Sequence, residues 1–140
     1  MILFFDACAL IYVIEGAEPF ASHVRSRIAE LARANTAYRV AISRLSCLEC
    51  RVGPMKTSDT RSLEKYDAFF NRPDVMVIEL TPQVVDLATA IRVRHGLRTP
   101  DALQAASCLQ AGPEHLFLTG DISFERVHGL HTALLNSNQQ

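Results

Sequence analysis

The sequence predicts an α/β fold: a three-layer α/β/α sandwich around a mostly parallel central sheet of four to five strands. Two observations indicate this class. Short apolar runs alternate along the chain with longer segments of helical periodicity. The first run, Ile2 to Phe5, is apolar at every position, as expected of a strand buried on both faces of a parallel sheet. A chain of 140 residues with 49% hydrophobic residues can form one self-sufficient core.

The elements are expected in the following order, within a single domain over residues 1–135. A short helix over 7–14 begins at the cap residue Asp6 and ends before Gly16, and a second helix covers 20–34. A strand over 38–42 leads through Ser43 into a helix over 44–52, which Gly53 and Pro54 are expected to stop before an exposed loop at 55–58. The remaining elements are a helix over 59–70, a strand over 75–80, a helix from Thr81-Pro82 to 95, a helix from Thr99-Pro100 to 111, a strand over 115–118, a helical turn over 122–127, a last strand within 130–135 and a disordered tail over 136–140.

Charge and composition exclude several classes of protein. The net charge of −1 argues against a surface that coats nucleic acid broadly, which needs a basic excess. Twelve of the fourteen basic residues are arginine, which suits bidentate phosphate contacts at a local site. No apolar run approaches the roughly 18 residues of a membrane helix, and no basic leader precedes the first strand. We therefore expect a cytoplasmic protein without membrane contact.

The cysteine pattern is weak as a metal or redox signal. Cys47 and Cys50 form a C-x-x-C, but this lies inside an expected helix, and no second close Cys or His pair completes a zinc site. We expect reduced, structural thiols.

Four acids stand where they can meet at one edge of the sheet. Asp6 and Asp121 follow apolar strands, whose carboxyl ends share an edge in a parallel sheet. Asp101 falls in the first turn of a helix, and Glu49 borders the packing face of the helix after Ser43. Taken singly, each has an ordinary alternative: Asp6 and Asp121 as helix caps, Asp101 as a partner of the helix dipole, and Glu49 as a surface acid.

A joint role for these acids implies a cation. Four clustered carboxylates repel one another unless a positive charge neutralises them. Ligands that are all oxygen select Mg²⁺ or Mn²⁺, and a carboxylate-held Mg²⁺ most naturally engages phosphate. We find no Ser, Cys or His nucleophile arrangement and no glycine-rich phosphate loop, so the pattern favours hydrolysis of a phosphodiester.

These segments resemble the PIN-domain nucleases, and most of all the VapC-type toxins of toxin–antitoxin modules. The resemblance rests on the strand into Asp6, Glu49 on its helix, the run Arg98 to Ala106 around Asp101, and Thr119-Gly120-Asp121-Ile122-Ser123-Phe124. It implies that Asp6, Glu49, Asp101 and Asp121, the acidic quartet, bind Mg²⁺ or Mn²⁺ and are catalytic, and that Thr119 is an accessory hydroxyl. The chain departs from the family at Cys8, where a hydroxyl residue is common.

The resemblance also implies a function and partners. The expected function is that of a metal-dependent endoribonuclease, the toxin of a type II module, with RNA as substrate, a cognate antitoxin and a homodimeric state. Arg44 and Arg98 are candidates for steering the RNA backbone, or they are simply solvated. The helices over 20–34 and 59–70, with Tyr66, Phe69 and Phe70, are a candidate antitoxin surface unless these aromatics are core. Two alternatives stay open: a catalytically inert PIN-fold module that binds RNA or protein, and a receiver-type signalling domain, for which neither Lys56 nor Lys65 is suitably placed.

Overall fold

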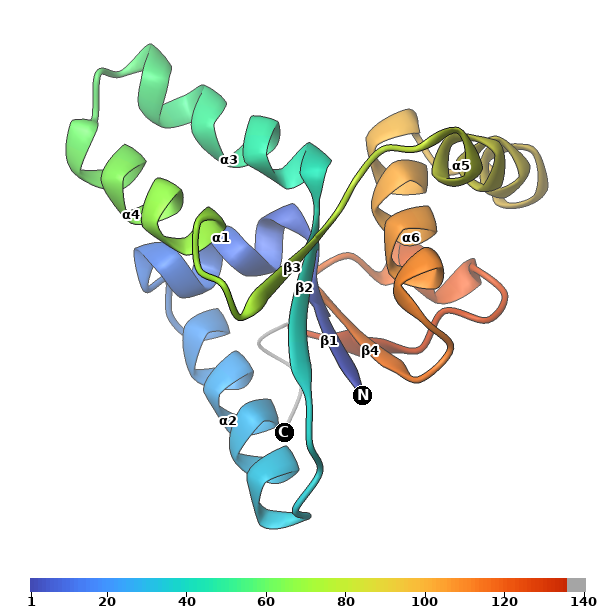
Figure 1. Ribbon diagram of the computed structural model, residues 1–140, viewed down its shortest axis with the longest axis horizontal. Helices are drawn as coiled ribbons and strands as arrows, with labels where there is room; N and C mark the ends of the chain where they lie inside the picture. The colour runs from blue at the N-terminus through green and yellow to red at the C-terminus, as the bar shows by residue number, and fades with distance from the viewer. Residues whose placement is uncertain (136–140) are drawn as a thin grey trace.

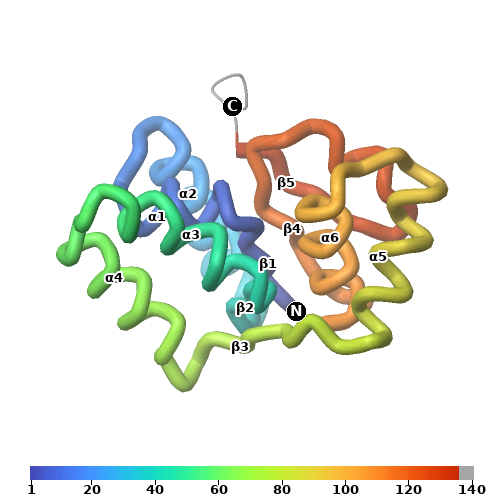
Figure 2. The backbone as a smooth tube through the Cα atoms, turned by 90° about the horizontal axis from the view of Figure 1, so that it is seen from above, coloured from blue at the N-terminus to red at the C-terminus, as the bar shows by residue number. Residues whose placement is uncertain are grey.

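Within the described residues, a five-stranded parallel sheet forms the centre of the molecule, in the order β3-β2-β1-β4-β5 (β1 to β4 are labelled in Figure 1 and β5 in Figure 2). The computed structural model describes residues 1–135, so the tail predicted at 136–140 lies outside the described residues. β1 is the central strand, between β2 and β4. The strands are β1 (Ile2–Phe5), β2 (Arg39–Ser43), β3 (Val75–Ile78), β4 (His115–Thr119) and β5 (Thr132–Leu134).

Helices cover both faces of this sheet, which confirms the predicted sandwich. Helices α1 to α4 lie on one side, and α5 and α6 lie on the other (Figures 1 and 2). Within residues 1–135, none of these helices is long and apolar enough to span a bilayer. They are α1 (Ala7–Glu15), α2 (Phe20–Arg33), α3 (Arg44–Lys56), α4 (Thr60–Phe70), α5 (Pro82–His95) and α6 (Thr99–Ala111), with the short 3-10 helix η1 (Ile122–Arg126) after β4.

The strand sequences are apolar throughout because each strand contributes to two cores. In β1, Leu3 and Phe5 belong to the core under α1 to α4, whereas Phe4 belongs to the core under α5 and α6. Phe4 stacks on Phe117 of the neighbouring strand, with ring centroids 5.4 Å apart. Both sides of the strand are therefore buried, which explains the absence of any polar residue in it.

The order of the strands creates one switch point. From β1 the chain moves outward through β2 to β3, then returns across the sheet to β4 and β5 on the other side of β1. In open parallel sheets, ligands bind at the carboxyl edge where the strand order reverses. Here that point lies between β1 and β4, and Asp6 and Asp121 follow these two strands.

Local signals place most helix boundaries as predicted. Ser43 and Thr81 accept hydrogen bonds from Leu45 and Val84 and begin α3 and α5. Gly16 and Gly96 follow α1 and α5 with φ values of 70° and 68°, the left-handed conformation that glycine adopts without strain.

The predicted end of α3 is wrong, and β3 ends at Ile78, two residues before its predicted end. Gly53 and Pro54 do not stop α3, which runs on to Lys56. Pro54 lies in the last turn, where its missing N–H removes one hydrogen bond, and the carbonyls of Gly53 and Pro54 still accept from Thr57 and Asp59. Residues 55 and 56 are therefore helical rather than loop.

The cap of α6 also differs from the expectation. Thr99 is the first helical residue rather than the cap, and Arg98 occupies the cap position without a side-chain hydrogen bond. The Thr99 hydroxyl instead accepts a hydrogen bond from Arg92 of α5, with the two atoms 2.8 Å apart. A contact between two helices has taken the place of a local cap.

A buried histidine gives the fold a predictable pH dependence. The Nδ1 of His115 lies 2.8 Å from the Gly112 carbonyl, and its Nε2 accepts from the His131 N–H at 3.0 Å. Burial lowers the pKa of His115 below 6.5. Protonation of Nε2 would remove the acceptor for the His131 N–H. This hydrogen bond therefore contributes about 1 kcal/mol to the free energy of unfolding above pH 6.5, and the contribution is lost as the pH falls through the lowered pKa.

We therefore expect the NMR titration of His115 to have its midpoint below 6.5, with the His131 amide exchanging faster at pH 5 than at pH 7 after correction for intrinsic rates. A midpoint at or above 6.5 would contradict this account of His115.

Candidate active site

Asp6 is both a helix cap and a buried acid, so the two interpretations of this residue are compatible. Its Oδ1 accepts the N–H of Ala9 at 2.7 Å, and only 5% of the residue is exposed. Burial raises the pKa of Asp6 from 3.8 to about 6, helped by the charges of Asp101 and Asp121, while hydrogen bonds from Thr119 and Ala9 oppose the rise. Two other acids of the quartet are thus close enough to affect it.

Thr119 connects Asp6 with Asp121. It is fully buried at the end of β4, its side chain hydrogen-bonds Asp6, and its Oγ1 accepts the N–H of Asp121 at 3.0 Å. Asp121 in turn accepts from the Ser123 N–H at 2.9 Å and caps η1. The hydroxyl therefore links the loop that carries Asp121 to the neighbourhood of Asp6, and the accessory role of Thr119 stays a prediction.

Gly120 and Tyr12 form part of the same edge. A Cβ built on Gly120 would lie 3.4 Å from the Tyr12 hydroxyl, so the loop before Asp121 packs closely on that ring. Burial, then the proximity of Cys8 and Asp6, raises the pKa of Tyr12. Sequence reasoning missed Tyr12, although its position four residues after Cys8 places both on one side of α1.

Asp101 and Arg98 lie at the start of α6. The Arg98 Nε is 3.3 Å from Asp101 Oδ2, and the Arg98 side chain is 82% exposed. Arg98 therefore stands in solvent beside a quartet acid, where the prediction that it steers RNA stays open. The Arg44 guanidinium forms two hydrogen bonds to Glu79, at 2.8 and 2.6 Å, so any role of Arg44 in RNA binding must compete with that pair.

Glu49 is held by side chains that sequence reasoning missed. Gln104 of α6 donates from Nε2 to Glu49 Oε1 and to Ser46 Oγ, both at 3.0 Å. Gln104 follows Asp101 by three residues and Ser46 precedes Glu49 by three, so each lies on the same helical face as a quartet acid. That spacing was the available signal.

The charges of the quartet all act on Cys8. Partial burial of the thiol, followed by the charges of Asp6, Glu49, Asp101 and Asp121, raises its pKa to about 11. Four carboxylates from four separate segments are thus close enough to this exposed residue to affect its pKa. The Cys8 sulfur stays protonated at neutral pH, so it offers a weak donor rather than a thiolate ligand.

The donor chemistry fits a hard divalent cation, although the side chains do not yet form a coordination shell. Within residues 1–135, no three His, Cys, Asp or Glu side chains are grouped so that they could hold an ion. Two of the carboxylates have other partners, Arg98 for Asp101 and the Ser123 N–H for Asp121, and Gln104 holds one oxygen of Glu49. A cation would satisfy the oxygen donors and relieve the unfavourable charge on buried Asp6.

The other sequence expectations have mixed outcomes. Cys47 and Cys50 are buried, free thiols, in agreement with a structural role. Tyr66 is fully buried, and its hydroxyl donates to Glu15, so the core alternative is right for this residue. Phe69 and Phe70 are half-buried and pack against the same core.

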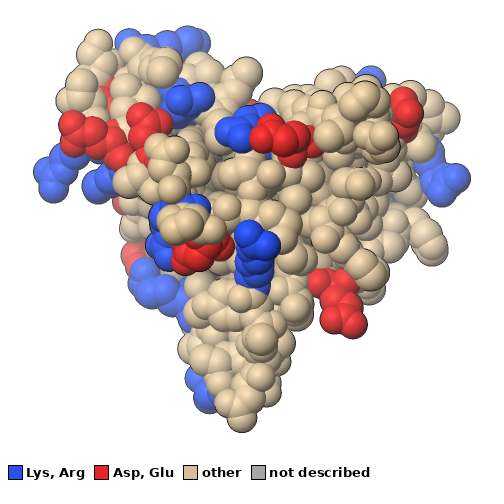
Figure 3. Space-filling view, in the orientation of Figure 1, with Lys and Arg blue, Asp and Glu red and all other residues tan. Residues whose placement is uncertain are grey.

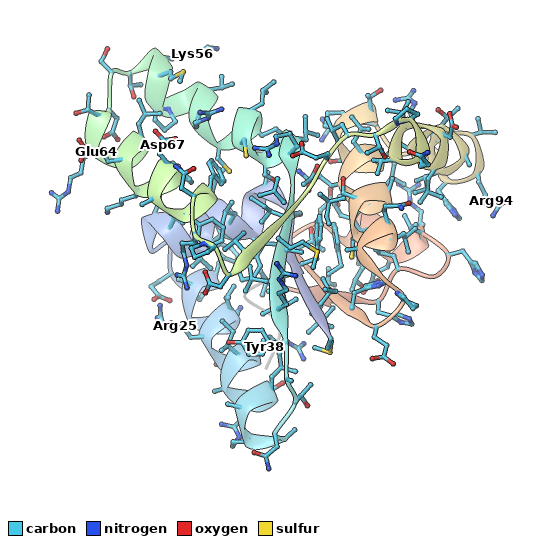
Figure 4. The ribbon with its side chains drawn as sticks, viewed as in Figure 1. Arg25, Tyr38, Lys56, Glu64, Asp67 and Arg94 are labelled. Carbon is cyan, nitrogen blue, oxygen red and sulfur yellow. The ribbon has the colours of Figure 1, made fainter. Side chains whose placement is uncertain are left out.

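Surface charge agrees with a local rather than a broad site. On the face drawn in Figure 3, basic and acidic side chains are interspersed, mainly over the half that carries α3 and α4. Lys56 of α3 and Glu64 of α4 point outward, Asp67 of α4 faces α3, where it pairs with Arg51 at 3.7 Å, and Arg94 projects from α5 at the opposite side (Figure 4). No continuous basic surface is visible on this face.

The fold and the site together define a class of α/β proteins in which two aspartates, Asp6 and Asp121, follow the strands on either side of the switch point of a parallel sheet. A sequence model of the PIN domain matches residues 3–130. The match covers most of the chain, and the protein belongs to the PIN-domain family. A search of curated protein sequences found no match.

Solved structures with the same fold include three toxin–antitoxin assemblies. VapBC2 from Rickettsia felis, bound to a DNA fragment from its promoter, is 17% identical, with a TM-score of 0.76 over 97% of this chain and 100% of that one. VapBC-1 from nontypeable Haemophilus influenzae is 16% identical, with a TM-score of 0.72 over 96% and 98%. A toxin–antitoxin complex from Klebsiella pneumoniae is 19% identical, with a TM-score of 0.64 over 96% and 98%.

Proposed function

We propose that the protein is a metal-dependent endoribonuclease, the toxin component of a type II toxin–antitoxin system. The observation that carries this proposal is that Asp6 and Asp121 follow the neighbouring strands β1 and β4 at the switch point of a PIN-domain sheet, with Asp101 close enough to affect the pKa of Asp6. An all-oxygen cluster of this kind suits Mg²⁺ or Mn²⁺ and, through the ion, a phosphodiester.

In this proposal Asp6, Glu49, Asp101 and Asp121 hold the cation. When bound, it supplies Lewis acidity toward phosphate and lowers the pKa of water. Asp6 contributes its carboxylate from a buried position that the Ala9 N–H and Thr119 fix in orientation. Thr119 keeps Asp121 near Asp6, and Arg98, exposed beside Asp101, is placed to receive the RNA backbone.

RNA cleavage tests this function directly. Purified protein incubated with structured RNA is expected to cleave it with Mn²⁺ or Mg²⁺, to stop in EDTA, and to lose at least about a hundredfold in rate when Asp6 becomes Asn. RNA cleavage that persists in EDTA, or in the Asp6→Asn variant, would contradict the proposed metal-dependent function.

A catalytically inert binding module is the second candidate, and Cys8 is the observation that favours it. Where the family commonly has a hydroxyl, this chain has a thiol close to the quartet acids. Tight RNA binding with no cleavage under any metal condition would support the inert module.

The partner that we propose is an antitoxin segment carrying apolar and acidic side chains. A depression of about 470 Å³ lies between α1 and α4, with an apolar floor and basic residues at its edge. The similar solved structures are toxin–antitoxin assemblies, which supports this occupant. The depression is lined by Val13, Ile14, Lys65, Ala68, Phe69 and Arg72.

We also propose a homodimer, formed through α3. Leu48, Val52 and Met55 are exposed and lie along one side of this helix, beside the quartet residue Glu49. A second copy packed on this apolar stripe would remove it from water. Sedimentation of the purified protein measures its state directly.

A further inference from the structure

A buried polar seam joins α3 and α6 next to the quartet. At its inner end, the hydroxyls of Ser107 and Ser43 are 3.0 Å apart. One turn toward the sheet edge, Gln104 donates to Ser46 and Glu49, with both distances 3.0 Å. Gln104 is only 3% exposed, so these contacts are made away from water. The seam ends at a quartet carboxylate.

The amide of Gln104 is only half satisfied. Its two N–H groups are used, but its Oε1 is buried and has no hydrogen-bond partner within residues 1–135. If the amide were flipped, Oε1 would face the Glu49 carboxylate, which only accepts hydrogen bonds. Glu49 therefore fixes the orientation of the Gln104 amide. An unpaired buried carbonyl is unfavourable, and an apolar side chain of similar volume would fill the site without this cost. Stability alone does not explain a glutamine here.

We propose that Gln104 is a positioning residue that presents the Glu49 carboxylate to the divalent cation of the quartet. One N–H is anchored on Ser46, which lies one turn before Glu49 on α3, and the other holds Glu49 Oε1. Oε2 has no hydrogen bond within the described residues and is left for a ligand. This inference rests on the proposed metal-dependent function.

Glu49 needs such support more than the aspartates do. Its longer side chain has more rotatable bonds, and repulsion from the other acids favours rotamers directed away from them. A hydrogen bond to one carboxylate oxygen restricts these rotamers and orients the other. Hydrogen-bond partners behind metal ligands typically account for tenfold to a hundredfold in metal affinity.

The test measures Mn²⁺ binding to the metal-free full-length chain by titration calorimetry. Gln104→Met, close in volume, is expected to weaken Mn²⁺ binding by about tenfold to a hundredfold while the melting temperature stays equal or rises. In a Glu49→Gln background, Gln104→Met should have little further effect, because the residue acts through Glu49. Ser107→Ala, which breaks the neighbouring contact of the same seam, should lower the melting temperature and leave Mn²⁺ affinity unchanged.

The outcomes separate this inference from the proposed function. The positioning role would be overturned if Gln104→Met bound Mn²⁺ with wild-type affinity. It would also be overturned if the losses of Mn²⁺ binding energy in Gln104→Met and Glu49→Gln were additive. Neither result would contradict the metal site. If Ser107→Ala weakened Mn²⁺ binding as much as Gln104→Met does, the effect would come from the packing of α3 on α6, and the positioning role would also be overturned. Absence of Mn²⁺ binding by the wild type, or undiminished binding in both Asp6→Asn and Glu49→Gln, would overturn the proposed metal site itself.

Discussion

Replacing Asp6 with asparagine is expected to make the metal-free protein more stable while abolishing cleavage. The folded state raises the pKa of Asp6 from 3.8 to about 6, mainly through burial. Since the folded pKa lies above the unfolded one, ionisation opposes folding. The penalty is absent below pH 3.8, grows up to pH 6 and then stays constant at up to about 3 kcal/mol. Asparagine carries no charge and can still accept the Ala9 N–H.

Urea unfolding in EDTA measures this effect. At pH 8 the free energy of unfolding of Asp6→Asn should exceed that of the wild type by up to about 3 kcal/mol, and the difference should shrink as the pH falls toward 4. Adding Mn²⁺ should stabilise the wild type and not the variant, because only the wild type gains by binding. An Asp6→Asn variant less stable than the wild type at pH 8 would show that the buried charge is already compensated.

Replacing Thr119 with valine is expected to damage both the fold and the site. Valine has the shape of threonine, but it cannot bond Asp6 and it leaves the Asp121 N–H without its acceptor. The lost hydrogen bond to a charged group and the unpaired Asp121 N–H together should lower the free energy of unfolding by about 3 kcal/mol. The pKa of Asp6 should also rise further, since the bond from Thr119 lowers it.

Thr119→Ser is the matched control, because it keeps the hydroxyl and removes only a methyl group. We expect Thr119→Ser to retain most of the stability and RNA cleavage that Thr119→Val loses, as measured by urea unfolding and initial cleavage rates. Equal behaviour of the two variants would mean that packing of the methyl group, rather than the hydroxyl bridge, is what Thr119 contributes.

Much of the fold could be predicted because its signals are local. The apolar run of β1, the Ser43 and Thr81 caps and the glycines after α1 and α5 each depend on a few neighbouring residues. Prediction failed where a distant contact decided the outcome. The Thr99 hydroxyl accepts from Arg92 of another helix instead of capping its own. Pro54 is a separate case, because the last turn of α3 tolerates it locally.

The same division holds at the site. Asp6 and Asp121 could be placed together because both follow parallel strands, and strand order in such sheets brings their ends to one edge. The spacing of Gln104 from Asp101 places both on one helical face, but it could not pair Gln104 with Glu49, since 55 positions of sequence separate these two residues. The sequence left Tyr66 open between a surface and a core position because its helix is polar-rich, and the structure buries it with its hydroxyl donating to Glu15 of α1.

The central claim is that the four acids form one cation site, and diffraction from crystals soaked in Mn²⁺ tests it most directly. In the metal-free arrangement the carboxylates are engaged by Gln104, Arg98 and the Ser123 N–H. We predict an anomalous peak at the Mn edge between Asp6 and Asp121, with Asp101 turned toward it and Glu49 still held by Gln104, and no such peak in Asp6→Asn. A peak elsewhere, or none at saturating Mn²⁺, would contradict the account.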